Sequence, residues 1–277
     1  MEVIGARTSG IIAVHLWGRP CNIDALLDIA RERNLKLIFD AAHAFGCSHQ
    51  GRPIGNFGAA EVFSFHATKV VTTFEGGAVV TNDDQLAERV RLMRNFGFAD
   101  YDYVQCLGTN AKLSEAGAAM GLTSLESFAQ RLNKNRQWYH LYQEYLASEG
   151  AIRCVAYNES EHNNFRYVVI ELDLTAGEIT RDDVLCVLRA ENVLARRYFF
   201  PGCHRMEPYR SKPGEQRLLS ETDYVSNRVL VLPTDEAITA EAIDQICGII
   251  RMCIKHGADL AKRLRGGCNV SASTPTE

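Results

Sequence analysis

Two polar side chains stand where apolar segments of the sequence end, 29 positions apart. Asp40 follows the apolar run Leu35–Phe39 and opens the segment DAAHAFG. Lys69 lies beyond the apolar run Ala60–Phe65, near whose end Ser64 is found. One strand–connection–strand step brings the two side chains to neighbouring strand ends, and open α/β sheets bind ligands at that edge.

An amine, a carboxylate and a hydroxyl at one sheet edge match the needs of pyridoxal 5′-phosphate (PLP). This cofactor needs a lysine amine for its Schiff base, a carboxylate against its pyridinium nitrogen, and hydroxyl or backbone N–H donors for its phosphate. Lys69, Asp40 and Ser64 supply these groups. A released lysine amine can also move a proton between the substrate carbon and the cofactor. The residues therefore predict PLP chemistry with Lys69 as the catalytic residue.

Each of these residues has a simpler interpretation when it is taken alone. An aspartate after a strand often caps the following turn, and an isolated lysine is usually a solvated surface charge. A histidine such as His43 is often a partly buried core residue. Gly76 and Gly77 are typical of a plain turn as well as of a close backbone approach to a cofactor. The functional hypothesis depends on the residues acting together.

The elements that must position these residues alternate between strand and helix, which is typical of a parallel sheet covered on both faces. Hydrophobic periodicity predicts strands at Ile11–Leu16, Leu35–Phe39, Ala60–Phe65 and Gly77–Thr81. It predicts helices at Ile23–Arg33, with Asn22 as N-cap, and from about Asp83 to Arg94. From Leu113 to about Ser148 the chain is predicted to form one helix or a broken pair that joins two parts of the molecule.

The pattern changes after Gly150 and predicts a small α+β domain. Its predicted strands are Asn164–Leu172, Val193–Tyr198 and Asn227–Leu232, and its helices are Arg181–Glu191 and Ala240–His256. The fold class is therefore α/β, with a mostly parallel sheet in a large domain at 1–150 and a small C-terminal α+β domain at 151–262. The Ser/Thr/Pro-rich residues 263–277 are predicted to be a flexible tail.

Composition narrows the possible classes of protein. The 277 residues are 46% hydrophobic and 23% charged, as in soluble globular proteins, and the net charge of −4 favours no nucleic-acid partner. Nine cysteines without a CxxC pair predict reduced thiols in a cytoplasmic protein and no metal site. The apolar N-terminal stretch is too short for a signal peptide or a membrane span.

Three longer stretches resemble one family, the DegT-type sugar aminotransferases, which are PLP enzymes of the aspartate-aminotransferase fold (fold type I). The stretches are HLWGRPCNIDALLDIARERNLKLIFDAAHAFGCSHQGRPIGNFG, FSFHATKVVTTFEGGAVVTND and LGTNAKLSEAGAAMGLTSLE. RRYFFPGCHRMEPY and VLPTDEAIT match more loosely, so that the resemblance extends to about Arg251. It implies that the first domain is the C-terminal portion of the fold type I large domain.

The resemblance also implies a role for each matching residue. Lys69 corresponds to the Schiff-base lysine, and Asp40 to the carboxylate that faces the pyridinium nitrogen. His43 corresponds to a residue beside the pyridoxal ring near its 3-hydroxyl, and Ser64 to a phosphate ligand. Asn110 corresponds to a residue that reaches across a homodimer interface to the phosphate of the partner's cofactor, so that the active site is shared.

The same resemblance implies a substrate class. Relatives with histidine in place of the lysine are dehydratases, so Lys69 favours transamination. The residues of these motifs most resemble those of enzymes that aminate C4 of dTDP-4-keto-6-deoxyglucose in deoxyaminosugar biosynthesis. The amino donor implied is L-glutamate. Residues expected to border the sugar nucleotide, each with packing as the alternative, are His66, Tyr198, His204 and Tyr209.

The chain departs from the family pattern at its N-terminal end. Family members begin with further large-domain elements, including a Gly-Thr/Ser turn that binds the PLP phosphate, which nothing before Ile11 supplies. The alternatives are a fragment that is inactive without this turn, or a shortened, non-catalytic relative that acts as a dimerising or regulatory protein. A nucleotide-binding α/β protein is disfavoured because no GxGxxG or GxxxxGK[ST] loop follows a strand.

Overall fold

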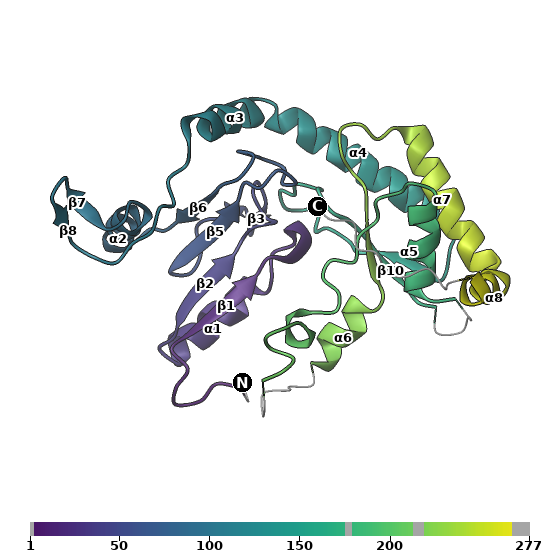
Figure 1. Ribbon diagram of the computed structural model, residues 1–277, viewed down its shortest axis with the longest axis horizontal. Coiled ribbons are helices and arrows are strands. Elements are labelled where there is room, and N and C mark those ends of the chain that lie inside the picture. Colours follow the sequence, from purple (N-terminus) through teal and green to yellow (C-terminus); the bar gives the residue numbers. More distant parts are fainter. Residues whose placement is uncertain (1–2, 175–178, 213–218, 268–277) are drawn as a thin grey trace. The chain divides into compact units, whose positions relative to one another are not determined.

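The computed structural model describes residues 3–174, 179–212 and 219–267. Backbone contacts divide the chain into two compact units (Figure 1). The first unit comprises Met1–Arg136 and Tyr157–Arg166, and the second comprises Gln137–Ala156 and Tyr167–Glu277. The chain therefore leaves the first unit and returns to it before it completes the second.

The first unit is built on a four-stranded sheet with the strand order β1-β2-β5-β6. The first three strands are parallel, as predicted, whereas the fourth runs antiparallel to β5. The connection between β5 and β6 is therefore a hairpin-like loop, and this loop contains Lys69. The strands are β1 (Gly10–Val14), β2 (Lys36–Asp40), β5 (Ala60–Ser64) and β6 (Gly77–Val80).

One face of this sheet carries the core, and the other carries the candidate site. Alternate residues such as Leu37, Phe39 and Phe63 are buried together with residues of helix α1 (Ile23–Glu32). Successive strand residues point to opposite faces, so Asp40 and Val62 share the other face, and both are exposed there. The period of two thus turns the Asp40 carboxylate away from the core.

Helices begin where the sequence places capping residues. The side chain of Asn22 accepts a hydrogen bond from the Ala25 N–H at 3.2 Å, which confirms the predicted N-cap of α1. The long helical region breaks at Ser127 into two helices. The remaining elements that begin in the first unit are β3 (Ser48–His49), β4 (Arg52–Pro53), α2 (Asp84–Arg94), β7 (Phe98–Asp100), β8 (Tyr103–Val104), α3 (Glu115–Glu126) and α4 (Phe128–Leu146).

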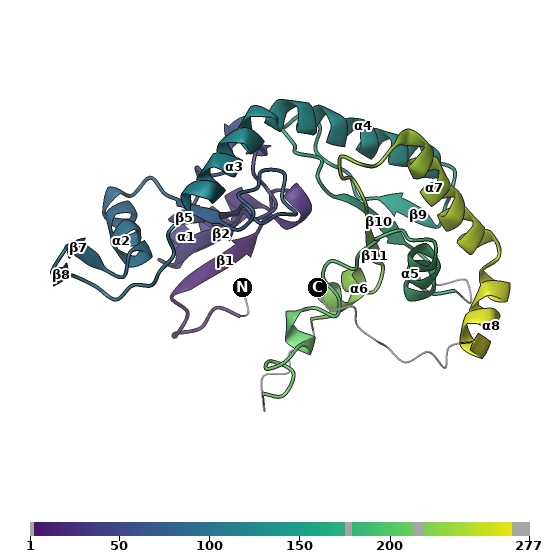
Figure 2. The same cartoon turned by 45° about the horizontal axis from the view of Figure 1, so that its top comes forward.

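The second unit contains an antiparallel sheet with the order β11-β10-β9. Helices α5, α7 and α8 contact one another, and Figure 2 shows α5 near the strands. Strand β9 and helix α6 were not predicted. The elements are β9 (Ile152–Cys154), β10 (Val168–Leu172), α5 (Arg181–Ala190), α6 (Ser220–Ser226), β11 (Val229–Leu232), α7 (Ala240–Lys255) and α8 (Gly257–Gly267).

Two predictions for this unit were wrong. Residues 193–198 form no strand, because only Arg196 pairs with Val231 in an isolated bridge. A turn closed by the Phe200 N–H and the Arg197 carbonyl, at 2.7 Å, begins directly afterwards and ends the pairing. Residues 263–267, predicted as the start of a tail, are helical in α8, and 268–277 lie outside the described residues.

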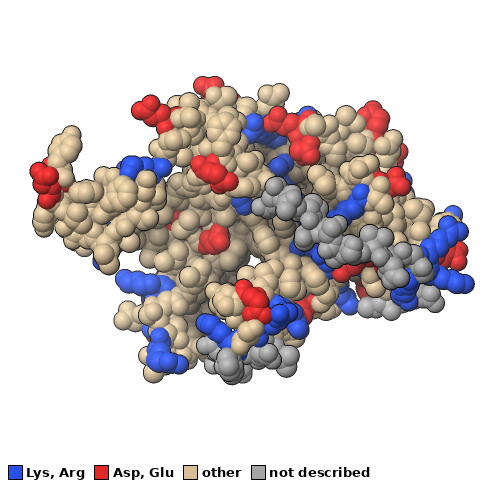
Figure 3. Space-filling view, in the orientation of Figure 1, with Lys and Arg blue, Asp and Glu red and all other residues tan. Residues whose placement is uncertain are grey.

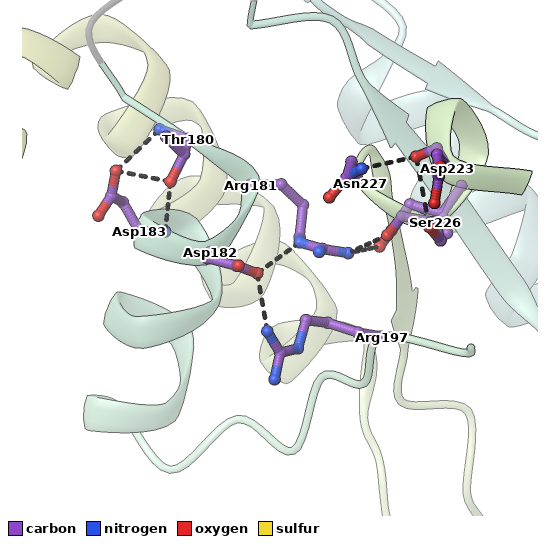
Figure 4. A network of polar contacts seen from close by, with 9 residues as sticks. Thr180, Arg181, Asp182, Asp183, Arg197, Asp223, Ser226 and Asn227 are labelled. Atoms are coloured by element: carbon purple, nitrogen blue, oxygen red, sulfur yellow. Dashed lines mark hydrogen bonds and ion pairs between the residues drawn. The ribbon is translucent and has the colours of Figure 1, made fainter. Parts of the chain in front are cut away.

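A buried arginine ties the second unit together (Figure 4). Arg181, the first residue of α5, is 4% exposed, and its Nη1 donates to the carbonyl oxygens of Ser226 and Val229 at 2.9 Å each. Its Nε donates to Oδ1 of Asp182 at 2.7 Å, and the same oxygen accepts from Arg197 at 3.2 Å. The charge of Arg181 is thus compensated within the unit.

Candidate active site

Lys69 lies in the loop that joins β5 to β6. Two backbone hydrogen bonds close the base of this loop, from the Phe65 N–H to the Gly76 carbonyl at 2.8 Å and from the Thr73 N–H to the Phe65 carbonyl at 2.9 Å. Within the loop, the Lys69 N–H donates to the His66 carbonyl at 2.9 Å. The amine is therefore carried by an irregular turn directly beyond a strand end.

The Lys69 amine is half-buried and has a lowered pKa. Burial is the largest cause, Arg166 lowers the pKa further, and Asp40 acts in the opposite direction. Within the described residues, no hydrogen bond is made to its Nζ. A larger share of this amine is thus neutral than at an exposed lysine, and the neutral amine is the nucleophilic form.

Asp40 ends β2 between the last registered residues of its two neighbouring strands, Val14 and Val62. One of its oxygens, Oδ1, accepts a hydrogen bond from the Ala42 N–H at 2.9 Å. Asp40 therefore caps the turn after its strand, as the simpler interpretation predicted. Its negative charge also acts on Lys69, so capping and a role at the site are compatible.

His43 completes a cluster of three titratable groups. Burial lowers the pKa of His43 to about 4, Lys69 lowers it too, and Asp40 partly opposes them. Its Nδ1 accepts a hydrogen bond from the Trp17 N–H at 3.1 Å, so the ring is neutral and Nε2 carries the proton. The electrostatic effects among the three groups indicate that Asp40, His43 and Lys69 lie near one another. The strand-end positions predicted this for Asp40 and Lys69, and the family resemblance implied it for His43.

Asn164, which was not singled out in the sequence, holds the His43 segment in place. It is fully buried, and its Nδ2 donates to the carbonyl oxygens of His43 and Phe45 at 2.9 and 3.0 Å. Gly18, at φ 72°, packs so closely that a Cβ there would lie 2.8 Å from Oδ1 of Asn164. The position was predicted as the start of a strand, but β10 begins only at Val168.

Ser64 and His66 flank the start of the Lys69 loop. Ser64 is the last residue of β5, pairs with Gly77, and accepts a hydrogen bond from the His66 N–H at 3.4 Å. The His66 ring lies 2.9 Å from the Thr68 hydroxyl and 3.4 Å from the Glu75 carboxylate. Ser64 thus presents a hydroxyl at the strand end, while His66 organises the turn itself.

Asn110 lies at the base of the arm formed by β7 and β8. Its backbone pairs with Asn95, the C-cap of α2, and the residue is exposed. Tyr101 and Leu107 in the same arm are 96% and 93% exposed. Asn110 therefore lies in a different part of the first unit from the cluster of Asp40, His43 and Lys69.

The other predicted substrate residues belong to the second unit. The Tyr198 ring stacks on Phe199 with ring centroids 4.8 Å apart, and Tyr209 is exposed. His204 Nε2 lies 3.0 Å from Oδ1 of Asp223, so its ring is engaged in an ion pair when protonated. Tyr198 and His204 thus make these contacts inside the second unit.

The groups that the first unit brings together fit PLP. An amine of lowered pKa suits the aldehyde carbon, a carboxylate suits a protonated ring nitrogen, and a hydroxyl at the adjacent strand end suits a phosphate. No group of three or more His, Cys, Asp or Glu residues that could hold a metal ion is found in the described part of the chain. The amine, the carboxylate and the hydroxyl together are the groups that PLP requires.

On the face shown in Figure 3, acidic and basic side chains are interspersed. Among the helices that the structure describes, none combines the length and the apolar character needed to cross a lipid bilayer.

Comparison with known sequences identifies the family. The sequence profile of the DegT/DnrJ/EryC1/StrS aminotransferase family matches residues 1–251. The chain belongs to this family. It is 34% identical over 252 residues to dTDP-4-amino-4,6-dideoxy-D-glucose transaminase of Shigella dysenteriae, which covers 90% of this chain and 68% of the relative. It is 33% identical to GDP-perosamine synthase of Caulobacter vibrioides, over 88% of this chain and 66% of the relative.

Solved structures give the same result. The crystal structure of DesI with its TDP-sugar product is 47% identical, with a TM-score of 0.90 over 95% of this chain and 67% of that chain. PseC, a Helicobacter pylori aminotransferase of pseudaminic acid biosynthesis, is 25% identical, with a TM-score of 0.83 over 92% of this chain and 69% of PseC. The predicted family and fold class are confirmed.

Family membership also establishes the class of enzyme. These proteins are PLP-dependent aminotransferases, so the predicted enzyme class and cofactor are confirmed. The matched part is about two thirds as long as the Shigella relative and DesI.

Proposed function

We propose that this protein transfers an amino group from L-glutamate to the C4 ketone of dTDP-4-keto-6-deoxyglucose, in the biosynthesis of a deoxyaminosugar. Family membership supports transamination of a nucleotide-linked sugar. The finer assignment is supported by the 47% identity to DesI, solved with a TDP-sugar product, and by the 34% identity to a dTDP-amino-sugar transaminase.

The observation that carries this proposal is the cluster of Asp40, His43 and Lys69 at the strand ends of the first unit. PLP, when bound, supplies a protonated ring that accepts electrons from the substrate carbon. Asp40 would hold the proton on the ring nitrogen through its charge. Lys69, with its lowered pKa, would hold the cofactor through its amine and would move a proton at the reacting centre.

The neutral state of His43 suits a place beside the ring near its 3-hydroxyl. The imidazole donates from Nε2 because Nδ1 is occupied by the Trp17 N–H. A neutral donor orients an oxygen without adding a cation that would compete with Lys69 for Asp40. Ser64 is assigned to the phosphate. The sugar-nucleotide contacts predicted for His66, Tyr198, His204 and Tyr209 stay predictions.

The proposed enzyme is a homodimer in which Asn110 reaches the phosphate site of the partner. The exposed apolar side chains of the β7–β8 arm support this assignment, because large exposed apolar groups next to one another mark interaction surfaces. Tyr101, Tyr103 and Leu107 of the arm precede Asn110 closely in the chain.

A spectroscopic and mass-spectrometric experiment tests the function. The full chain is mixed with PLP, the visible band of covalently attached cofactor is followed, and the attachment is trapped with borohydride and located by peptide mapping. We expect attachment at Lys69, loss of the band on adding L-glutamate, and formation of the amino sugar from dTDP-4-keto-6-deoxyglucose.

Lys69→Ala is expected to abolish the attachment and the product, because in the described part of the chain Lys69 is the lysine whose amine interacts with Asp40 and His43. Lys36→Ala is the matched control, since Lys36 is an exposed lysine at the start of β2. A wild-type protein that folds and dimerises but takes up no PLP at Lys69 would instead be a non-catalytic dimerising or regulatory relative.

A mixing experiment tests the shared site. Lys69→Ala and Asn110→Ala are each expected to be inactive as homodimers. After subunit exchange, a mixed dimer retains one site with both the Lys69 amine and the partner's Asn110 amide, so activity returns. Activity that stays absent in demonstrated mixed dimers contradicts the shared site.

A further inference from the structure

The two carbonyl oxygens on either side of Lys69 are each bonded to an arginine side chain. Arg166 Nε donates to the carbonyl of Thr68 at 3.1 Å, and Arg131 Nη1 donates to the carbonyl of Val70 at 3.4 Å. These partners are separated by 98 and 61 positions in the sequence. Both arginines belong to the first unit, Arg131 on α4 and Arg166 at the end of the returning segment.

Arg131 belongs to a larger frame that holds the same loop. Its Nη1 also donates to the hydroxyl of Ser124 at 3.1 Å, and Ser124 on α3 is fully buried. The Ser124 hydroxyl in turn accepts the Thr72 N–H at 3.1 Å. Helices α3 and α4 thus hold the loop at two points after Lys69, while Arg166 holds it at one point before.

This frame matters because no regular element fixes the peptide that carries the amine. The loop between β5 and β6 is irregular. A lysine side chain has four rotatable methylenes, so the position of Nζ depends strongly on the backbone beneath it. Functional groups need to be held to within about 0.5 Å by supporting contacts.

We propose that Arg166 and Arg131 are positioning residues for Lys69, because they fix the carbonyl groups of the residues directly before and after it, Thr68 and Val70. The inference rests on the proposed function of Lys69 as the lysine that binds the cofactor. Neither arginine is assigned a contact with substrate; both act through the backbone of the loop.

Arg166 makes a second contribution that Arg131 does not. Among the described residues, the charged groups that act on the Lys69 amine are Asp40, which raises its pKa, and Arg166, which lowers it; His43, whose pKa Lys69 lowers, is neutral. Removing the Arg166 cation should therefore raise the pKa of Lys69. Removing Arg131 should loosen the loop and leave that pKa unchanged, so the two variants are distinguishable.

The experiment uses the full chain with Arg166→Met, Arg131→Met and the matched control Arg52→Met. Arg52 also donates to a backbone carbonyl of the first unit, that of Asn56 at 3.2 Å, but in another loop. Without cofactor, competitive acetylation across a pH series with peptide mapping measures the pKa of Lys69, and hydrogen exchange measures protection of the amides of residues 68–73. With PLP, the fraction covalently attached is measured against its concentration.

We expect about tenfold weaker PLP attachment in Arg166→Met and in Arg131→Met, because each loses a hydrogen bond from a charged group. Both should lose amide protection in the loop, and only Arg166→Met should raise the pKa of Lys69. Arg52→Met should match the wild type in all three measurements. Folded Arg166→Met and Arg131→Met proteins that also match the wild type overturn the proposal.

Arg166→Lys provides a second variant, which keeps the cation but not the guanidinium geometry. Where Arg166→Met does not fold, weaker attachment in Arg166→Lys with an unchanged Lys69 pKa supports the proposal, and wild-type attachment overturns it. A wild-type chain that takes up no PLP refutes the proposed function. The positioning role is still decided by the two measurements made without cofactor, which are the pKa of Lys69 from acetylation and the protection of the loop amides from hydrogen exchange.

Discussion

The Lys69 cluster of the first unit and the Arg181 network of the second contain similar groups. Each has a central cation, half-buried at Lys69 and buried at Arg181, together with a carboxylate and a neighbouring arginine, and in each the pKa of the central cation is lowered chiefly by burial. The carboxylate raises that pKa in both, and the neighbouring arginine lowers it. The composition of the two clusters does not distinguish a site from a structural contact.

The difference lies in how the central cation is bonded. Arg181 donates to Asp182 and to two backbone carbonyls at 2.7 to 2.9 Å. Figure 4 shows the hydrogen bonds of its guanidinium group to Asp182 and Ser226. In the part of the chain that the structure covers, the Lys69 amine has no such bond, and the arginines near it bind its backbone instead. A cation with satisfied donors stabilises a fold, whereas one left unbonded on a fixed backbone can accept a ligand.

Among the substitutions that test this comparison, the largest expected effect comes from Asp40→Asn. The substitution keeps a cap for the turn through the amide oxygen but removes the charge that faces both Lys69 and His43. We expect the rate of amino transfer to fall about a thousandfold, as when an electrostatic group is removed at a reacting centre. Steady-state kinetics measures it. A decrease of less than about tenfold would show that Asp40 has a structural role like that of Asp182.

Arg181→Met should lower the free energy of unfolding by about 3 kcal/mol, because it leaves two buried carbonyls without a donor. Denaturant unfolding followed by tryptophan fluorescence measures this loss. Attachment of PLP to Lys69 at saturating cofactor should persist, since that site lies in the first unit. Loss of attachment in a folded Arg181→Met protein would remove the functional contrast between the two clusters.

His43→Gln should change how stability depends on pH. The folded pKa of about 4 lies below the ordinary value of 6.5, so the unfolded chain binds a proton first as the pH falls. His43 therefore costs stability progressively from about pH 6.5 down to about pH 4, by at most about 1.4 kcal/mol per pH unit. Glutamine can still accept the Trp17 N–H. Across this range, the free energy of unfolding should change less with pH in the variant than in the wild type. An equal pH dependence in the two proteins would contradict the assignment.

The smallest expected effect comes from Thr180→Ala. Thr180 caps α5 by accepting the Asp183 N–H at 3.2 Å, and the Asp183 carboxylate accepts the Thr180 N–H at 2.8 Å. Losing this capping box should cost about 1 kcal/mol, with no change in PLP attachment or in the pKa of Lys69. Thermal unfolding measures the cost, and a change at Lys69 would show that the units are coupled.

Local sequence patterns predicted the elements that carry the chemistry. Apolar runs that end in Asp40 and Ser64, the capping residue Asn22 and the family motifs around Lys69 all depend on neighbours a few positions away. For the same reason the short strand β9 was not predicted, and residues 193–198 were wrongly predicted to form a strand. Three residues of β9 are too few for a periodic signal, and the pairing of Arg196 depends on how far β11 extends beside it.

Tertiary structure alone decided which groups surround the amine. His43 is neutral chiefly because it is buried. Its Nδ1 accepts a hydrogen bond from Trp17, 26 positions away, and its loop depends on Asn164, 121 positions away. The bonds from Arg131 and Arg166 to the Lys69 loop span similar lengths of chain. Contacts of this kind leave no periodic trace, because they form only when the folded backbone brings distant segments to hydrogen-bonding distance. Residue type and spacing could therefore place an acid and an amine at one edge, and the fold determined their protonation and their support.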